Sequence, residues 1–166
     1  MPAIRAAYDG GREIQRTQGS SVWPEFSDAF ILGEIGAGCL FRVHADGELA
    51  GVFSVAYADP AIWGEHERGA HIYLHRIARA PGYRGRGLID AVLAWARVHC
   101  RTLGRDGLRM DTWASNSALI AYYQRLGFAL VQQRHIPADP RLPPHYHGVD
   151  LALLEEQCGA GVGEAP

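Results

Sequence analysis

A glycine-rich turn with two arginines is the segment of this sequence best suited to bind a phosphate group: Arg84-Gly85-Arg86-Gly87-Leu88-Ile89. It lies between a strand-like apolar run and a helix-like run that begins near Leu88. The first N–H groups of a helix have no partner inside the helix, and the helix N-terminus carries a partial positive charge. The two guanidinium groups add fixed positive charge at the same place. The sequence therefore predicts a site for a phosphorylated cofactor here.

Three histidines near the end of the chain, His135, His145 and His147, raise the question of a metal site. His145 and His147 would share one face of an extended segment, because they are two residues apart. A metal site also needs three or four ligands and supporting hydrogen bonds, and no cysteine or paired carboxylate stands at a clear spacing from them. We therefore expect no bound metal.

Two well-marked elements should position the phosphate-binding turn. The strand-like run before it extends from His71 to Ala78, and the helix after it from about Leu88 to Leu103. The helix carries one apolar stripe at helical spacing, formed by Leu88, Ile89, Val92, Leu93, Ala96, Cys100 and Leu103.

The rest of the chain reads as further helices and strands. We expect helices over residues 11–18 and 24–35, strands over 39–44, 49–55, 108–113, 128–134 and 149–154, and a helix capped by Ser115 or Asn116 and ended by Gly127. The Asp46-Gly47 pair between two apolar runs is a good hairpin turn. This order predicts a mixed α/β fold in which helices pack on a sheet. We expect a single domain over residues 1–158 and a glycine-rich, disordered tail over 159–166.

Bulk composition narrows the function classes. The formal net charge of −2 argues against a nucleic-acid-binding protein that depends on bulk positive charge. No run reaches the roughly 18 apolar residues that a membrane helix needs, and no signal peptide is visible. The three cysteines show no paired spacing, so we expect no disulfide framework and take a reducing cytoplasm as the default location.

Two motifs make the chain resemble the GCN5-related N-acetyltransferase (GNAT) superfamily over about residues 38–154. The cofactor motif of that family reads Arg/Gln-x-x-Gly-x-Gly/Ala, and Arg84, Gly87 and Ile89 occupy its three places. Further along the chain, Asn116, Tyr123 and the pair Gly127-Phe128 stand at the spacing of a second family motif.

The resemblance implies a GNAT-type fold with a mixed, mostly antiparallel, twisted sheet flanked by helices. It implies acetyl-CoA or a related acyl-CoA as co-substrate, with direct acyl transfer to an amine of a small molecule or peptide. Backbone amides of the turn would bind the pyrophosphate, and the pantetheine arm would pair with the preceding strand. The implied cofactor-binding residues are Ile77, Ala78, Arg79, Arg84, Gly85, Arg86, Gly87, Leu88, Ile89, Asn116 and Tyr123. For Asn116, helix capping alone is a sufficient explanation, and both roles can hold.

The resemblance also implies that Tyr123 protonates the departing sulfur. A phenol of pKa about 10 can give its proton to a thiolate whose conjugate acid has a pKa of about 8.5 only with help from its surroundings. Tyr123 could instead be a core aromatic, because it shares a helical stripe with Leu119, Ile120 and Leu126. A cysteine nucleophile is disfavoured, because Cys100 faces the helix core and Cys39 and Cys158 lie outside the motifs.

His75 is the best candidate for the general base. Tyr73, His75 and Ile77 fall on one strand face, and an imidazole of pKa about 6.5 is suited to take a proton from an amine near neutrality. In the family, some members carry histidines on this strand and many others a glutamate. The alternative is a histidine that only forms hydrogen bonds within the sheet or orders water. A catalytic His75 predicts that His75→Ala changes the acid limb of the pH–rate profile.

The turn departs from the family pattern at its last place, where Ile89 replaces Gly or Ala and Asp90 follows. A carboxylate there would repel a pyrophosphate unless it points to solvent. This favours, as an alternative, a non-catalytic acyl-CoA sensor or interaction module on the same fold. A nucleotide-binding Rossmann domain is a weaker possibility, because the Gly-x-Gly-x-x-Gly spacing is absent.

The acceptor is left open by the sequence, as is a homodimer. Acidic side chains could line a pocket for a polyamine or aminoglycoside, although charged residues are usually solvated: Asp28, Glu34, Glu65, Glu67 and Asp139. A peptide amino terminus or a small aromatic amine is equally open. By the resemblance, His145 and Tyr146 should help to shape the acceptor pocket, and Trp23, Trp63 and Trp113 are candidates for it unless they are core residues. Arg76 and Arg79 could steer phosphates, be solvated, or pair with Asp111.

Overall fold

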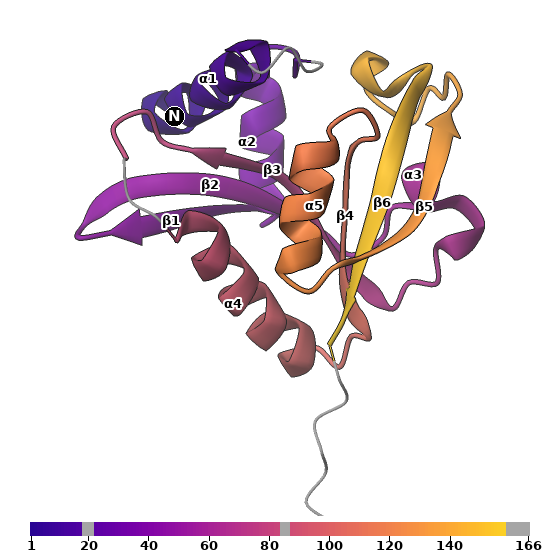
Figure 1. Ribbon diagram of the computed structural model, residues 1–166. Coiled ribbons are helices and arrows are strands. Elements are labelled where there is room, and N and C mark those ends of the chain that lie inside the picture. Colours follow the sequence, from indigo (N-terminus) through magenta and orange to yellow (C-terminus); the bar gives the residue numbers. More distant parts are fainter. Residues whose placement is uncertain (18–21, 84–86, 159–166) are drawn as a thin grey trace, which may run out of the picture. The chain divides into compact units, whose positions relative to one another are not determined.

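The computed structural model describes residues 1–17, 22–83 and 87–158 (Figure 1). The chain divides into two compact units, which we describe separately. The first unit comprises Met1–Ala56 and Leu74–Ala94, and the second Tyr57–Tyr73 and Trp95–Pro166. Strand β3 (His71–Arg79) and helix α4 (Leu88–Thr102) contribute residues to both.

The strands hydrogen-bond in the order β1-β2-β3-β4-β6-β5. Their bounds are β1 Leu40–Ala45, β2 Glu48–Ala56, β4 Gly107–Trp113, β5 Ala129–Ile136 and β6 Val149–Gln157. Strands β1 and β2, β4 and β6, and β5 and β6 pair antiparallel, whereas β3 and β4 run parallel. The predicted fold class, a mixed and mostly antiparallel sheet with flanking helices, is confirmed.

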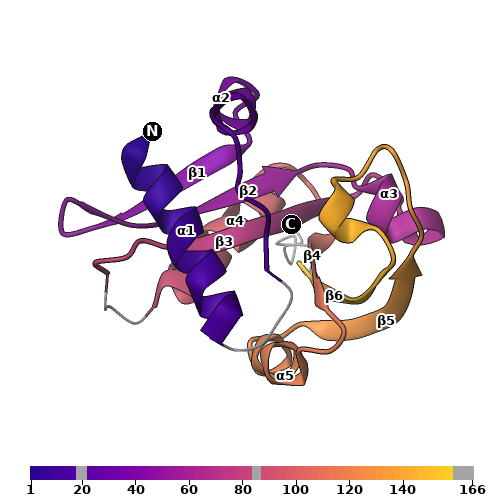
Figure 2. The same cartoon turned by 90° about the horizontal axis from the view of Figure 1, so that it is seen from above.

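In the first unit, helices α1 (Pro2–Thr17) and α2 (Asp28–Gly36) cover one face of β1 to β3, and the start of α4 lies on the other face (Figures 1 and 2). The first face buries one apolar cluster: Ile4, Ala7, Tyr8, Phe26, Ile31, Val52 and Ala78. Aromatic rings dominate it, with Tyr8 and Phe26 packed edge to face at 4.8 Å between ring centroids.

The predicted starts of the two early helices were wrong. Helix α1 begins at Pro2 instead of near Gly11, and Gly10 and Gly11 lie inside it. They allow close packing, because a Cβ on Gly11 would lie 3.0 Å from the Trp23 ring. Helix α2 begins after Ser27 instead of at Pro24, because the Ser27 hydroxyl accepts a hydrogen bond from the N–H of Phe30 and caps the helix.

In the second unit, β4 lies between β3 and β6, with α5 (Ser117–Arg125) packed against β5 and β6. Short helical turns occupy the connections: α3 (Pro60–Trp63), η1 (Gly64–His66) and η2 (Pro144–Tyr146). Leu108 and the run Leu151–Leu154 are fully buried in the centre of this sheet.

The predicted long helix is confirmed, but its last predicted stripe residue lies outside it. Helix α4 stops at Thr102, and Leu103 is 45% exposed and lies outside the apolar stripe. Gly104 adopts a left-handed φ of +60°, and the N–H groups of Gly104 and Arg105 donate back to the carbonyls of Arg101 and Cys100. These two hydrogen bonds form a Schellman motif, which ends the helix before Leu103 can join the stripe.

None of the helices in the described ranges is both long enough and apolar enough to cross a membrane. The single-domain prediction stays a prediction, and the predicted tail over residues 159–166 lies outside the described residues.

Gly51 of β2 is required by a close approach between elements of the first unit. A Cβ on Gly51 would lie 2.6 Å from the carbonyl oxygen of Ala78 and 2.8 Å from a methyl group of Leu88. We expect Gly51→Val to lower the free energy of unfolding by about 1–3 kcal/mol, because the added atoms must displace backbone. Chemical denaturation measures this difference.

The matched control for this prediction is Gly33→Ala in α2, where the added methyl group would have no atom of another described segment within 4 Å. Alanine should leave stability unchanged or raise it by about 0.5–1 kcal/mol, because glycine is a poor residue in a helix interior. Equal stability of the Gly51→Val variant and the wild type would contradict the packing role of Gly51.

Candidate active site

The second motif encodes both ends of helix α5. Asn116 is the N-cap, and its side-chain oxygen accepts a hydrogen bond from the N–H of Leu119 at 3.0 Å. At the other end, Gly127 has a left-handed φ of +109°. The N–H groups of Gly127 and Phe128 donate to the carbonyls of Gln124 and Tyr123, at 3.1 Å each. This is a second Schellman motif, and the predicted N-cap and terminal glycine are confirmed.

Tyr123 is held by the residue that ends its own helix. Phe128 follows the terminal glycine, and its ring packs edge to face on the Tyr123 ring at 5.9 Å between centroids. Tyr123 is 8% exposed. Burial raises the pKa of Tyr123 above its ordinary value, and the neighbouring Tyr122 acts in the same direction. The phenol is therefore held in its neutral, proton-carrying form.

The start of α4 supplies the described part of the predicted phosphate cradle. Gly87 has a left-handed φ of +98°, which favours glycine, and its carbonyl accepts the first hydrogen bond of the helix, from the N–H of Ala91 at 2.8 Å. The N–H groups of Leu88 and Ile89 precede that bond. Arg84, Gly85 and Arg86 were also predicted for this cradle, and they lie outside the described residues.

The two residues that depart from the family pattern can now be placed. Ile89 is half-buried, and Asp90 is exposed in the first turn of α4. One carboxylate oxygen of Asp90 lies 3.9 Å from the Cβ position that Gly87 leaves empty. A carboxylate in the first turn stabilises the helix through the macrodipole. The negative charge of Asp90 therefore offsets part of the positive potential that would attract a bound anion.

Strand β3 is irregular at Arg76, whose left-handed φ of +50° departs from extended backbone, and we call this irregularity the bend in β3. The predicted face shared by Tyr73, His75 and Ile77 depended on unbroken alternation, and the left-handed residue interrupts that alternation after His75. The parallel ladder between β3 and β4 ends at the pair Tyr73 and Arg109, although β3 continues to Arg79.

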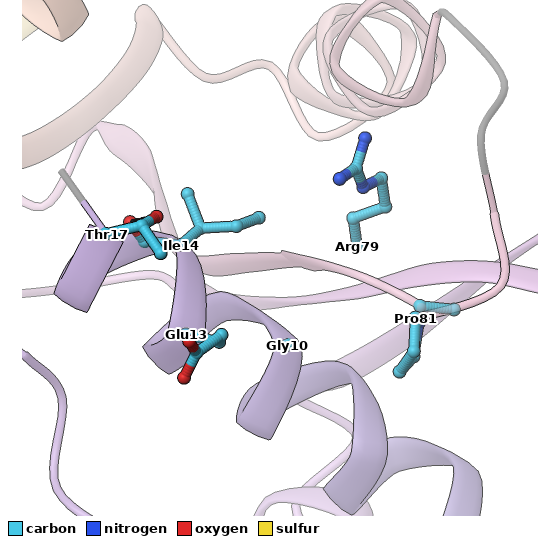
Figure 3. Close-up of a pocket in the computed structure, with 7 residues that line it drawn as sticks. Gly10, Glu13, Ile14, Thr17, Arg79 and Pro81 are labelled. Atoms are coloured by element: carbon cyan, nitrogen blue, oxygen red, sulfur yellow. Dashed lines mark hydrogen bonds between the residues drawn. The ribbon is translucent and has the colours of Figure 1, made fainter.

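The residues predicted to pair with the cofactor arm differ in exposure. Ala78 is buried in the apolar cluster of the first unit, Ile77 is half-buried, and Arg79 is exposed. Arg79 lines an open groove of about 320 Å³ with Pro81 and residues of α1 that include Glu13, Ile14 and Thr17. Figure 3 shows the Arg79 and Ile14 side chains projecting to the same side of this groove.

The environment of His75 differs from the one assumed for a base near neutrality. Burial lowers the pKa of His75 to about 3, and the positive charge of Arg76 acts in the same direction. The imidazole is therefore neutral throughout the physiological range, and the premise of an ordinary pKa near 6.5 was wrong. A neutral imidazole can still accept one hydrogen bond and donate another.

Arg76 has a partner other than the predicted alternatives. Its guanidinium donates to the Glu34 carboxylate at 2.5 Å and lies 5.2 Å from the Phe30 ring centroid. Most of the acidic residues considered for an amine pocket are likewise engaged: Asp28 with Arg5, Glu34 with Arg76, Glu67 with the N–H groups of Asp59 and Gly69, and Asp139 with Arg141. Arg141 lowers the pKa of the Asp139 carboxyl to about 2.

A buried polar group around Arg109 was not found from the sequence. Arg109 is 5% exposed, donates to Glu155 at 2.7 Å and to the Tyr73 hydroxyl at 3.1 Å, and stacks over the Trp63 ring at 4.2 Å. Trp63, predicted as a pocket candidate, is a fully buried core residue. An arginine between two apolar strand residues was the available signal, since buried charges need partners.

The aromatic residues near η2 form one group. Trp113 lies 6.2 Å from Tyr146, and Tyr146 lies 4.5 Å from His145, measured between ring centroids. The other two histidines have separate contacts, His135 with the Asp150 carboxylate and His147 with the carbonyl of Asp139, both at 2.9 Å. The three histidines thus serve different local contacts.

Comparisons with known proteins agree with this arrangement. The sequence profile of the acetyltransferase (GNAT) family matches residues 9–128. The chain belongs to the GNAT acetyltransferase family. This match spans the α4 turn and the whole α5 motif, so the sequence-based assignment is confirmed.

Individual relatives include two curated bacterial proteins. The uncharacterized N-acetyltransferase YesJ of Bacillus subtilis is 32% identical over 126 residues, which are 70% of this chain and 69% of that protein. Streptothricin acetyltransferase of Streptomyces lavendulae is 32% identical over 87 residues, 52% of this chain and 42% of that protein. The chain thus spans less than half of the second relative.

A solved Bacillus subtilis acetyltransferase in complex with CoA has the same fold. Its TM-score is 0.56 at 18% identity, and the alignment covers 79% of this chain and 84% of that one. GNAT acetyltransferases use acetyl-CoA as the acetyl donor. The roles of individual site residues in this family member stay predictions.

The cap of α5 can be tested separately from any role of Asn116 in binding. We expect Asn116→Ala to lower the free energy of unfolding by about 1 kcal/mol, because the N–H of Leu119 loses its acceptor. Asn116→Ser should retain most of the stability, because its hydroxyl can cap the helix. If chemical denaturation shows all three proteins unfolding at the same denaturant concentration, the capping role fails.

The shifted pKa of His75 predicts a pH dependence of stability. The folded chain has a pKa of about 3 at His75, whereas the unfolded chain has about 6.5, so only the unfolded chain takes up a proton as the pH falls between them. His75 thus contributes stability above pH 6.5 that is lost toward pH 3, by up to about 1.4 kcal/mol per pH unit. Denaturation of His75→Gln at several pH values should show a shallower loss.

A direct NMR titration of the His75 ring is the independent check. The ring should stay neutral when the pH is lowered to 5. A titration midpoint near the ordinary histidine value would contradict the buried state of the imidazole.

Proposed function

We propose that this GNAT family member is an acetyl-CoA-dependent N-acetyltransferase that moves an acetyl group directly to an amine of a small molecule or peptide. The observation that carries the proposal is helix α5, which is capped at both ends and holds Tyr123 buried and protonated. Burial alone would also fit a core aromatic. What favours the catalytic role is that Tyr123, the cap Asn116 and the terminal Gly127 all stand at the spacing of the family motif.

The described residues suit the phosphate groups of acetyl-CoA. The left-handed Gly87 carries no side chain, and among the described residues the atom nearest its empty Cβ position is an Asp90 carboxylate oxygen at 3.9 Å. The N–H groups of Leu88 and Ile89 are the donors we assign to the pyrophosphate, together with the residues from Arg84 to Arg86 in the sequence. Arg79, exposed beside the groove of the first unit, adds positive charge near the end of β3.

The co-substrate arm is assigned to β3. Its backbone beyond Tyr73 extends past the ladder with β4, and an extended amide chain can pair with such N–H and C=O groups. We assign this role to Ile77, Ala78 and Arg79. The thioester supplies an activated acyl group, and the protein must bind it, orient it and provide a proton for the departing sulfur.

The proton chemistry follows from the two shifted side chains. Tyr123 is neutral and gives its hydroxyl proton to the departing thiolate. Because its raised pKa makes the phenol a weak acid, this transfer requires that the hydroxyl lie in direct contact with the sulfur. His75 accepts a hydrogen bond as a neutral ring and does not set an acid limb near pH 6.5. The acid limb of the pH–rate profile should instead follow the ionisation of the acceptor amine. We therefore expect His75→Ala to leave the position of this limb unchanged.

Direct transfer is supported by the state of the cysteines. Cys100 is fully buried at the end of α4, and burial together with the neighbouring Cys158 raises the pKa of its thiol to about 12. A thiol in this state supplies almost no thiolate, so it is a poor nucleophile for a covalent acetyl intermediate.

For the acceptor, we propose an amine bound mainly by aromatic and backbone groups. Trp113, Tyr146 and His145 offer an aromatic wall, which suits a cationic or planar amine. The relation to streptothricin acetyltransferase supports a small amine-bearing molecule over a protein acceptor.

The experiment that tests the function has two steps. Calorimetry should show that acetyl-CoA binds, and a coupled thiol-release assay with a panel of polyamines, aminoglycosides, streptothricins, arylalkylamines and peptides should show turnover. Binding without turnover on the whole panel would favour the non-catalytic sensor, for which Asp90 at the helix start is the supporting feature. No binding of acetyl-CoA would overturn the proposal.

The role of Tyr123 is tested by removing only its hydroxyl. Tyr123→Phe should lower turnover at least tenfold and leave acetyl-CoA binding nearly unchanged, because the ring and its contact with Phe128 are kept. The control is Tyr57→Phe, which removes the hydroxyl of a tyrosine outside the α5 motif that is 36% exposed, and it should keep turnover within about twofold. Unchanged turnover in Tyr123→Phe would remove the hydroxyl from the mechanism.

A further inference from the structure

Arg76 adopts a backbone conformation that its own residue type does not favour. Its φ of +50° lies in the left-handed region, which glycine, asparagine and aspartate adopt most readily. Apart from Arg76, the non-glycine residue in this region among the described ranges is Asp46, in the tight turn between β1 and β2. A long side chain in the middle of a strand has no such local reason, so contacts elsewhere must hold the conformation.

The side chain of Arg76 supplies those contacts. Its guanidinium donates to a carboxylate oxygen of Glu34 at 2.5 Å, and the same oxygen accepts the Ser54 hydroxyl at 2.7 Å. The guanidinium also lies 5.2 Å from the centroid of the Phe30 ring. We call these four residues the Arg76 clamp. Charge-assisted bonds shielded from water are stronger than exposed ones.

The Arg76 clamp is partly buried and joins three elements of the first unit. Ser54 of β2 is 1% exposed, and the side chains of Arg76 and Glu34 are 17% and 20% exposed. Phe30 and Glu34 come from α2. Tyr8 of α1 is buried nearby, and the charge of Arg76 opposes the rise that burial causes in the pKa of Tyr8. The clamp therefore ties the bend in β3 to the helical layer.

The bend lies next to the part of β3 that the proposed function assigns to the co-substrate. It lies between His75 and the segment Ile77–Arg79, which the proposed function assigns to the co-substrate arm. A left-handed residue turns the peptide groups that follow it, so it sets the direction of the N–H and C=O groups of that segment. Loss of the clamp would therefore change the orientation of the backbone groups of Ile77–Arg79, although none of these residues is substituted.

We propose that Arg76 is a positioning residue for acetyl-CoA: through Glu34, Ser54 and Phe30, its side chain holds the bend that aims the backbone of Ile77–Arg79 at the co-substrate. This inference rests on the proposed function. It adds a specific requirement, namely that residues of α2 and β2 distant from the motif set the affinity for the co-substrate.

The test uses variants that separate backbone conformation from side-chain contacts. Arg76→Ala removes the side-chain contacts of the clamp, but alanine still disfavours a left-handed φ, so the bend should be lost. Acetyl-CoA should then bind at least tenfold more weakly in calorimetry. Arg76→Gly also removes the clamp but adopts a left-handed φ freely, so it should recover part of that loss. Glu34→Gln keeps the shape and should weaken binding at least threefold, with a higher KM for acetyl-CoA and an unchanged KM for the amine.

The matched control is Asp28→Asn, which removes the ion pair between Asp28 and Arg5 of α1 and does not touch β3. It should bind acetyl-CoA as the wild type does. Amide hydrogen exchange at Ile77 and Ala78 should be faster in Arg76→Ala and Glu34→Gln than in the wild type and in Asp28→Asn. Should Arg76→Ala fail to fold, Glu34→Gln carries the same comparison.

The outcomes separate this inference from the proposed function. Wild-type affinity and wild-type exchange rates in Glu34→Gln and Arg76→Ala would overturn the positioning role. Equal weakening in Asp28→Asn would also overturn it, because the effect would then reflect general stability of the helical layer. No binding of acetyl-CoA by the wild type would overturn both proposals.

Discussion

Backbone N–H and C=O groups at the ends of helices need partners, and the way this chain meets that need determines its candidate site. The start of α4 follows Gly87, whose left-handed φ turns the chain into the helix and whose carbonyl accepts the first helical hydrogen bond. Both ends of α5 are closed instead, by Asn116 at the start and by the Schellman motif of Gly127 and Phe128 at the finish. The two closed ends hold the helix that carries Tyr123, whereas the start of α4 is the end to which we assign the anion in the proposed function.

This difference explains which parts of the structure could be predicted from the sequence. The ends of α5 are local, since a side chain and a glycine within a few residues satisfy the backbone, and both were predicted. The Schellman motif after Thr102 is equally local, and Gly104 was its visible signal. The start of α1 was misplaced, because Gly10 and Gly11 lie inside the helix and pack against Trp23 and β3, a contact that the sequence does not show.

The features that sequence could not predict depend on contacts between distant segments. The bend at Arg76 is held by residues from α2 and β2, and no pattern within β3 announces it. The pKa of His75 depends on burial, which periodicity does not measure. Arg109 is another case, because its partners Glu155 and Tyr73 come from strands far apart in the sequence. In each case the environment of a polar group is formed by segments that only folding brings together.

The two shifted side chains also constrain how charge can be handled during transfer. Tyr123 and His75 are both neutral, so neither offers a fixed charge to a thioester or an amine. Most of the carboxylates considered for amine binding already bind arginines or backbone N–H groups within the fold. A cationic acceptor would therefore gain little from them, and loss of its proton is favoured where charge is poorly compensated. An acceptor amine bound among neutral and aromatic groups would be favoured in its unprotonated form, which is the form that attacks a thioester.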